Sequence, residues 1–219
     1  SSTSRGLGDV YKRQVIGVGN VGSKLLEQID KQTDYLNENL RLKIRVVAIS
    51  NSRKMLLDEE SISLKDWESQ LNKSYIIADR DVFFEYAKKL NLRNSIFIDN
   101  TANEVVAKEY ARYLNNSIGV VTCNKIAAAD ELSNYHNLKD ISRKYGSPFL
   151  FETNVGAGLP VIDTLNNLIA SGDQIIKIQA VLSGSLNFVF NNFKKGSSFH
   201  DVVLEAKKEG YTAVSYTHL

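Results

Sequence analysis

Short apolar runs alternate with longer segments of helical period along this chain. Runs of strand length lie at residues 15–16, 42–49, 95–99, 118–122 and 149–151. Helical segments begin at residue 23 and span residues 63–71, 81–90, 103–114 and 130–145. Such alternation is typical of a parallel sheet with helices on both faces. The pattern therefore predicts an α/β fold built on a doubly wound parallel sheet.

The turn after the first apolar run is rich in glycine and reads GVGNVG over residues 17–22. Gly17 permits a tight turn from strand to helix, and Gly19 lets the backbone approach a pyrophosphate. Gly22 lets the helix pack closely on the strand, with its N-terminus facing the phosphates. The strand before the motif and the helix after it favour a Rossmann-like dinucleotide site over a glycine-rich turn without a ligand. The expected pyrophosphate contacts are Gly17, Gly19, Asn20, Val21 and Gly22.

The second strand ends without the acidic residue that holds the adenosine ribose in many NAD sites. Residues 50–54 read SNSRK instead. Ser52 leaves room for a 2′-phosphate, and Arg53 and Lys54 supply cations suited to bind it. This segment favours NADP over NAD as the cofactor. A solvated basic turn is the alternative interpretation.

Polar or glycine-rich loops follow three further strands, at residues 99–103, 122–125 and 152–160. Ligands of open α/β folds bind at the carboxyl ends of the strands, so these loops are expected to converge. Lys125 is the strongest single candidate, because an ammonium beside a nicotinamide can hold a carboxylate or carbonyl oxygen of a substrate. An ordinary surface lysine is the alternative.

Composition narrows the class of protein. The 219 residues are 43% hydrophobic and 24% charged, as in ordinary soluble globular proteins. No apolar run approaches the ~20 residues that span a bilayer, which argues against a membrane partner and favours the cytoplasm. A formal net charge of +2 without a basic block argues against nucleic acid. Cys123 is the only cysteine, and an inert small residue is preferred over a catalytic nucleophile there.

Three motifs later in the chain carry a family resemblance: ETNVGAGLPVI at residues 152–162, SGD at 171–173 and LSGSLNF at 182–188. They resemble homoserine dehydrogenase, most closely the dehydrogenase half of bifunctional aspartokinase/homoserine dehydrogenases. The resemblance runs through residues 15–212 in family order. It implies an NAD(P)-dependent oxidoreductase that interconverts L-aspartate 4-semialdehyde and L-homoserine in threonine and methionine biosynthesis.

The resemblance also implies roles for single residues. Thr101 and Lys125 would line the nicotinamide end of the cofactor. The amino acid substrate would contact Lys125, Gly184, Ser185 and Tyr211.

A monovalent cation, typically sodium, is implied as well. Its ligands would be Glu152 and the backbone carbonyls of Val155, Ala157 and Leu159. Oxygen ligands from an irregular loop suit a hard cation. The alternative for Glu152 is a capped turn in which its carboxylate bonds backbone amides.

The resemblance divides the chain into two domains. Residues 15–159 would form the nucleotide domain, and residues 160–212 part of an α+β substrate and dimerisation domain. Helical spacing at 161–168 and 199–209 and an alternating strand pattern at 175–182 support this division. In the family such a sheet pairs two subunits, so a homo-oligomer is expected.

Both ends depart from the family. The distal lysine that donates a proton to the substrate has no counterpart, so Lys125 would have only a supporting catalytic role. Residues 1–14 and 213–219 resemble translated sequencing-adapter read-through and are expected to be a non-native leader and tail. We therefore expect an incomplete piece of a longer gene, inactive by itself. A noncatalytic dinucleotide-binding module is the alternative.

Overall fold

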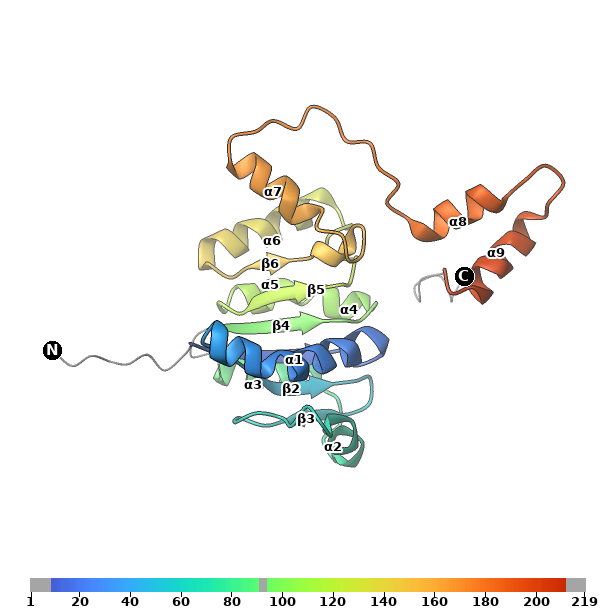
Figure 1. Cartoon of the computed structure of the whole chain (residues 1–219). Coiled ribbons are helices and arrows are strands. Elements are labelled where there is room, and N and C mark those ends of the chain that lie inside the picture. The colour runs from blue at the N-terminus through green and yellow to red at the C-terminus, as the bar shows by residue number, and fades with distance from the viewer. Residues whose placement is uncertain (1–8, 91–93, 212–219) are drawn as a thin grey trace. The chain divides into compact units, whose positions relative to one another are not determined.

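A six-stranded sheet forms the centre of the first part of the chain (Figure 1). The computed structural model describes residues 9–90 and 94–211, so the expected tail at 213–219 and residues 1–8 of the expected leader lie outside it. The strands are β1 Asp9–Ile16, β2 Leu42–Ser50, β3 Met55–Leu57, β4 Ser95–Asp99, β5 Gly119–Thr122 and β6 Phe149–Leu150. Their order is β3-β2-β1-β4-β5-β6. All neighbours pair in parallel except β3, which is antiparallel to β2.

Helices cover both faces of this sheet, which confirms the doubly wound α/β class (Figure 1). These helices are α1 Asn20–Asn39, α2 Trp67–Lys73, α3 Arg80–Lys89, α4 Glu104–Ala107, α5 Tyr110–Leu114 and α6 Leu132–Tyr145. On one face Leu26 of α1 and Leu71 of α2 pack with Val15 of β1. On the other face the rings of Phe97 and Tyr113 stack with their centroids 3.9 Å apart.

Helix ends follow the sequence closely. Asp79 caps α3 by accepting the N–H groups of residues 81 and 82, and Asn103 caps α4 in the same way. Gly146 ends α6 in the left-handed conformation at φ 61°, as glycine does at many helix ends. The single helix expected at 103–114 is divided into α4 and α5.

Strand β1 begins at Asp9, well before the apolar run at residues 15–16. Its first half is polar, and burial lowers the pKa of Arg13 to about 10. Gln14 is fully buried, and neither polar atom of its amide has a hydrogen-bond partner in the described part of the chain. The expectation that residues 1–14 are a non-native leader concerns their origin and stays a prediction.

We expect Gln14→Met to stabilise the first part of the chain. The change keeps the length of the side chain and removes a buried amide without partners, which costs about 1–3 kcal/mol. Urea unfolding should therefore show a higher midpoint. Gln28→Met on the exposed side of α1 is the matched control and should leave the midpoint unchanged. An unchanged or lower midpoint for the Gln14 variant would contradict the expectation.

The second part of the chain is a separate compact unit that begins at Glu152, whereas the sequence places the domain boundary after residue 159. It contains the 3-10 helix η1 Glu152–Asn154 and the helices α7 Ile162–Ala170, α8 Gly184–Asn192 and α9 Phe199–Lys208. Val189, Val202 and Ala206 form its small core. The strand expected at 175–182 is wrong for this structure. Those residues are irregular and exposed, because a strand needs a neighbouring strand to bond.

Candidate functional site

The glycine loop between β1 and α1 fits closely against the loop that follows β4. Gly17 has φ +83°, and a Cβ there would lie 2.7 Å from Cγ2 of Thr101. A Cβ on Gly22 would lie 2.0 Å from the carbonyl oxygen of Gly17. A Cβ on Gly19, by contrast, would meet nothing within 4 Å. Two glycines are therefore required by packing, and the third faces open space.

The N-terminus of α1 presents free backbone amides beside that open space. Its N-cap is Gly19, which has no side chain to accept these N–H groups, and the first turn contains no acidic residue. Asn20 and Val21 are exposed. A helix N-terminus of this kind attracts an anion through its N–H groups and its dipole. The loop has the geometry expected of a pyrophosphate site.

Two cavities adjoin the glycine loop. One of about 440 Å³ is lined by residues that include Gly19, Trp67 and Asn72. The other, of about 320 Å³, is lined by residues that include Arg80, Phe83 and Asn103. Both linings contain Gly17, Ser52 and Thr101. These three residues follow β1, β2 and β4, at the point where the strand order reverses and where ligands of open α/β sheets bind.

The basic segment after β2 is a defined turn. Asn51 Oδ1 accepts the backbone N–H groups of Arg53 and Lys54, each at 2.8 Å. The ammonium of Lys54 donates to the carbonyl oxygen of Asn72 at 2.5 Å, near the C-terminus of α2. Arg53 is exposed. Among the described residues, Ser52 lines both cavities, and neither Arg53 nor Lys54 is in either lining.

A buried network centred on Asp99 joins the loops that follow β4 and β5. Asp99 Oδ2 accepts the hydroxyl of Tyr110 at 2.6 Å and the amide Nδ2 of Asn124 at 3.0 Å. Asp99 Oδ1 accepts the backbone N–H of Thr101 at 2.7 Å. Asn124 also donates to the carbonyl oxygen of Asn103 at 3.0 Å. The expected meeting of these two loops is confirmed.

Sequence reasoning missed the part that Tyr110 has in this network. Its side chain is fully buried on α5, and its hydroxyl lies 2.8 Å from Oγ1 of Thr122. Burial, together with the charge of Asp99, raises the pKa of Tyr110, so it stays a hydrogen-bond donor. A tyrosine on the helix after an aspartate-ending strand is the signal that could have revealed this pair.

Lys125 and Cys123 occupy different environments on the loop after β5. Lys125 is exposed and follows the buried Asn124. Burial and the nearby charge of Asp99 raise the pKa of the Cys123 thiol. A protonated thiol is a poor nucleophile, which supports the inert interpretation of Cys123. Within the described residues, no group of three or more His, Cys, Asp and Glu side chains is placed to hold a metal ion.

Glu152 opens the second unit and caps helix α7. Its two carboxylate oxygens accept the N–H groups of Ile162 and Asp163 at 2.9 and 2.8 Å. These are the contacts of the capped-turn alternative. Between the carboxylate and the helix, the chain passes through left-handed conformations at Gly156 and Ala157. The loop that carries Val155, Ala157 and Leu159 is therefore a tight turn closed by Glu152.

Three of the four residues expected at the substrate lie at the start of α8 and after α9. Ser185 donates its hydroxyl to the carbonyl oxygen of Tyr211, and the ring of Tyr211 stacks on Phe188 with centroids 4.4 Å apart. A Cβ on Gly184 would meet nothing within 4 Å. The structure brings Ser185 and Tyr211 together within the second unit.

A doubly wound sheet with an open glycine loop at its switch point defines a dinucleotide-binding fold. The chain belongs to the homoserine dehydrogenase family. Residues 17–152 match the NAD-binding domain of homoserine dehydrogenase, and residues 160–217 match the homoserine dehydrogenase family model. None of the helices in the described residues is long and apolar enough to cross a membrane.

Named relatives agree with this assignment. The bifunctional aspartokinase/homoserine dehydrogenase of Haemophilus influenzae is 42% identical over 198 residues, which are 90% of this chain and 24% of that protein. Homoserine dehydrogenase of Schizosaccharomyces pombe is 37% identical over 90% of this chain and 54% of its own length. The chain thus spans about a quarter to a half of these relatives.

A solved structure supports the fold. A hyperthermophilic archaeal homoserine dehydrogenase mutant in complex with NADPH has a TM-score of 0.76 and 23% identity. The likeness covers 96% of this chain and 64% of that one.

Proposed function

We propose that the protein to which this chain belongs interconverts L-aspartate 4-semialdehyde and L-homoserine with NAD(P). The observation that carries the proposal is the glycine loop, whose backbone is open at Gly19 beside the joined loops of Thr101 and Lys125. Family membership favours this enzyme over a noncatalytic dinucleotide-binding module. Aspartate semialdehyde, a small amino acid, is the proposed substrate.

The dinucleotide, when bound, supplies or accepts a hydride. The chain binds its pyrophosphate at the N-terminus of α1 and holds the nicotinamide end near Thr101 and Lys125. The Lys125 ammonium orients a carbonyl or carboxylate oxygen of the substrate and stabilises the negative charge that develops there. Gly184, Ser185 and Tyr211 contact the amino acid.

The test follows NADPH absorbance with aspartate semialdehyde in the full-length protein that contains this chain. Lys125→Met should reduce kcat/KM strongly, by roughly 10²-fold, because it removes an electrostatic contact at the reacting end. Lys144→Met, an exposed lysine of α6, is the matched control and should leave kcat/KM unchanged. Full turnover of the Lys125 variant would remove Lys125 from the mechanism, and an inactive wild-type protein would reject the proposed reaction.

NADP is the proposed cofactor in preference to NAD, with Ser52, Arg53 and Lys54 at its 2′-phosphate. Arg53→Ala should weaken NADPH binding about tenfold or more and leave NADH binding unchanged, because a charge-assisted contact contributes about 1.5–3 kcal/mol. Lys54→Ala should have a smaller effect, since its ammonium already bonds Asn72. Fluorescence titration of both dinucleotides measures the ratio. Equal losses for NADH and NADPH would contradict a 2′-phosphate contact.

Sodium is proposed at the turn closed by Glu152, with the backbone carbonyls of Val155, Ala157 and Leu159 as further ligands. Carboxylate and carbonyl oxygens suit this hard cation. Each oxygen of Glu152 accepts one N–H group here, and a carboxylate offers about four acceptor positions, so capacity for a cation remains.

Glu152→Ala in the full-length protein should abolish the sodium dependence of turnover and lower stability by about 1 kcal/mol, because α7 loses its cap. Asp163→Ala, which changes the exposed first turn of α7 but not the loop, is the matched control. Steady-state kinetics across a sodium titration provide the measurement. A sodium response that survives in the Glu152 variant would count against this site.

We also propose that the protein is a homo-oligomer and that it acts in the cytoplasm. Support for the oligomer is the resemblance of the second unit to a dimerisation domain, together with the apolar side chains that this unit exposes, such as Ile176 and Phe190. Light scattering of the full-length protein tests the oligomeric state.

A further inference from the structure

The cavity of about 320 Å³ has an apolar floor and a polar rim. Ile16, Phe83 and Val106 are buried and line its base. Ser52, at its edge, follows β2 and belongs to the ribose end of the crevice, whereas Lys125 follows β5 on the far side of β1 and β4. Among the described residues, Thr101, which follows β4, is also in the lining, whereas no residue of the loop after β5 is. The cavity therefore extends from the middle of the crevice to the adenosine end of a bound dinucleotide.

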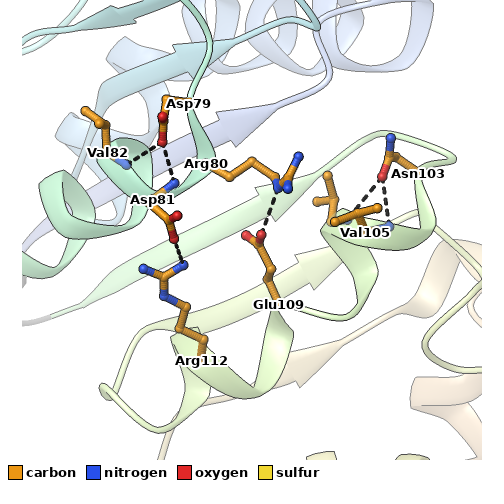
Figure 2. Close-up of polar contacts among 9 residues, drawn as sticks. Asp79, Arg80, Asp81, Val82, Asn103, Val105, Glu109 and Arg112 are labelled. Carbon is orange, nitrogen blue, oxygen red and sulfur yellow. Dashed lines mark hydrogen bonds and ion pairs between the residues drawn. The ribbon is translucent and has the colours of Figure 1, made fainter.

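Two of the polar residues on the rim are occupied by local hydrogen bonds. Asp79 Oδ1 accepts the N–H groups of Asp81 and Val82 at the start of α3. Asn103 Oδ1 accepts the N–H groups of Val105 and Val106 at the start of α4. Figure 2 shows both caps on either side of Arg80. Oδ1 of each side chain therefore serves a helix N-terminus, and these bonds fix Asp79 and Asn103 in place at the rim.

Arg80 is held at the rim by one bond and keeps the rest of its guanidinium available. Its Nε donates to Oε1 of Glu109, the N-cap residue of α5, at 2.8 Å, and Figure 2 shows the side chain reaching across to that carboxylate. Glu109 is largely buried and its second oxygen has no other partner among the described residues, so it depends on Arg80 for compensation. The side chain of Arg80 is half exposed. Glu109 therefore fixes the plane of the guanidinium while leaving its surface accessible.

We propose that Arg80 is a cofactor-binding residue whose guanidinium lies over the adenine ring of the dinucleotide in this cavity. The inference rests on the proposed cofactor and adds the residue that recognises its base. An apolar floor suits the flat purine, and guanidinium groups stack on aromatic faces. Arg80 acts on the base, and the 2′-phosphate is left to the segment after β2.

The experiment titrates the 219-residue chain with NADPH, NADH and reduced nicotinamide mononucleotide, which lacks the adenosine half. Arg80→Leu should weaken NADPH and NADH by the same factor, about threefold to tenfold, and leave the mononucleotide unchanged. Arg80→Lys keeps the positive charge opposite Glu109 but replaces the planar guanidinium with an ammonium. It should therefore lose less affinity for the two dinucleotides than Arg80→Leu, and its unfolding midpoint should stay unchanged. The lysine variant tests the same contact if the leucine variant fails to fold.

Arg112→Leu is the matched control. Arg112 pairs with Asp81 at 2.5 Å across the same α3–α5 interface and lies over Phe84, outside the cavity lining. It should leave all three affinities unchanged. A loss confined to NADPH would place Arg80 at the 2′-phosphate, a loss that includes the mononucleotide would make its role structural, and no loss would remove the contact. Each of these overturns the inference. Absence of NADPH binding by the wild-type chain would instead reject the proposed cofactor.

Discussion

Gly22→Ala is expected to destabilise the nucleotide unit and to weaken NADPH binding in the same variant. The new Cβ would lie 2.0 Å from the carbonyl oxygen of Gly17, which is backbone and cannot rotate away. Helix α1 must therefore move outward from β1, at a cost of about 1–3 kcal/mol. The shift also displaces the amides at the N-terminus of α1 from the pyrophosphate. Urea unfolding and fluorescence titration with NADPH measure the two effects.

Gly19→Ala is expected to weaken NADPH binding without affecting the stability of the fold. Its Cβ would meet nothing within 4 Å, and its φ of −74° is allowed for alanine, so the free energy of unfolding should change by less than about 0.5 kcal/mol. NADPH binding should still fall about tenfold, because the methyl group occupies the space needed by the pyrophosphate. If the Gly19 variant binds NADPH like the wild type, the pyrophosphate does not lie over this loop.

The contrast between these glycines explains why the nucleotide fold could be predicted from sequence. Few residues other than glycine allow the tight turn at Gly17 or the close approach of Gly22 to the carbonyl oxygen of Gly17. These local requirements therefore appear in the sequence as conspicuous glycines. The strands at 95–99 and 118–122 are similarly evident, because a buried parallel strand is a short apolar run.

Elements that depend on distant partners could not be predicted. Strand β3 has three residues and exists because it pairs with the end of β2. The polar residues 31–40 show no helical period in the sequence, yet α1 continues to Asn39. Exposed ion pairs such as Lys31 with Glu27 lie along this helix, but they contribute little individually. The apolar periodicity ends after Ile29, the last buried residue of α1. The pattern of apolar residues therefore gave no indication that the helix continues beyond it.

The direction of side chains was the second feature that could not be predicted from the sequence. Arg53 and Lys54 are adjacent and alike in charge, but the turn made by Asn51 leaves Arg53 exposed and directs Lys54 to the carbonyl oxygen of Asn72. Nor does sequence spacing reveal that Arg80 belongs to the rim of a cavity, since the carboxylate that holds it is Glu109, 29 residues further along the chain. Both facts follow from packing between elements.

The buried carboxylate of Asp99 is expected to be the most sensitive single position of the site. Asp99→Ala removes one acceptor from each of three donors, namely the Tyr110 hydroxyl, the Asn124 amide and the Thr101 N–H. Hydrogen bonds to a charged group contribute about 1.5–3 kcal/mol each, so losing three of them should lower the free energy of unfolding by about 4.5 kcal/mol or more. Chemical unfolding followed by tyrosine fluorescence measures the loss.

Tyr110→Phe removes a single bond of the same network and should lower stability by about 1–2 kcal/mol. In a double-mutant cycle the two losses should be strongly non-additive, because Tyr110 and Asp99 share one hydrogen bond of 2.6 Å. NADPH affinity separates a site role from a purely structural one. Tyr110→Phe retains the fold, so a weaker complex in that variant shows that the network positions the loops of Thr101 and Lys125. Additive losses with unchanged NADPH affinity would mean that the network stabilises the sheet and has no part in the site.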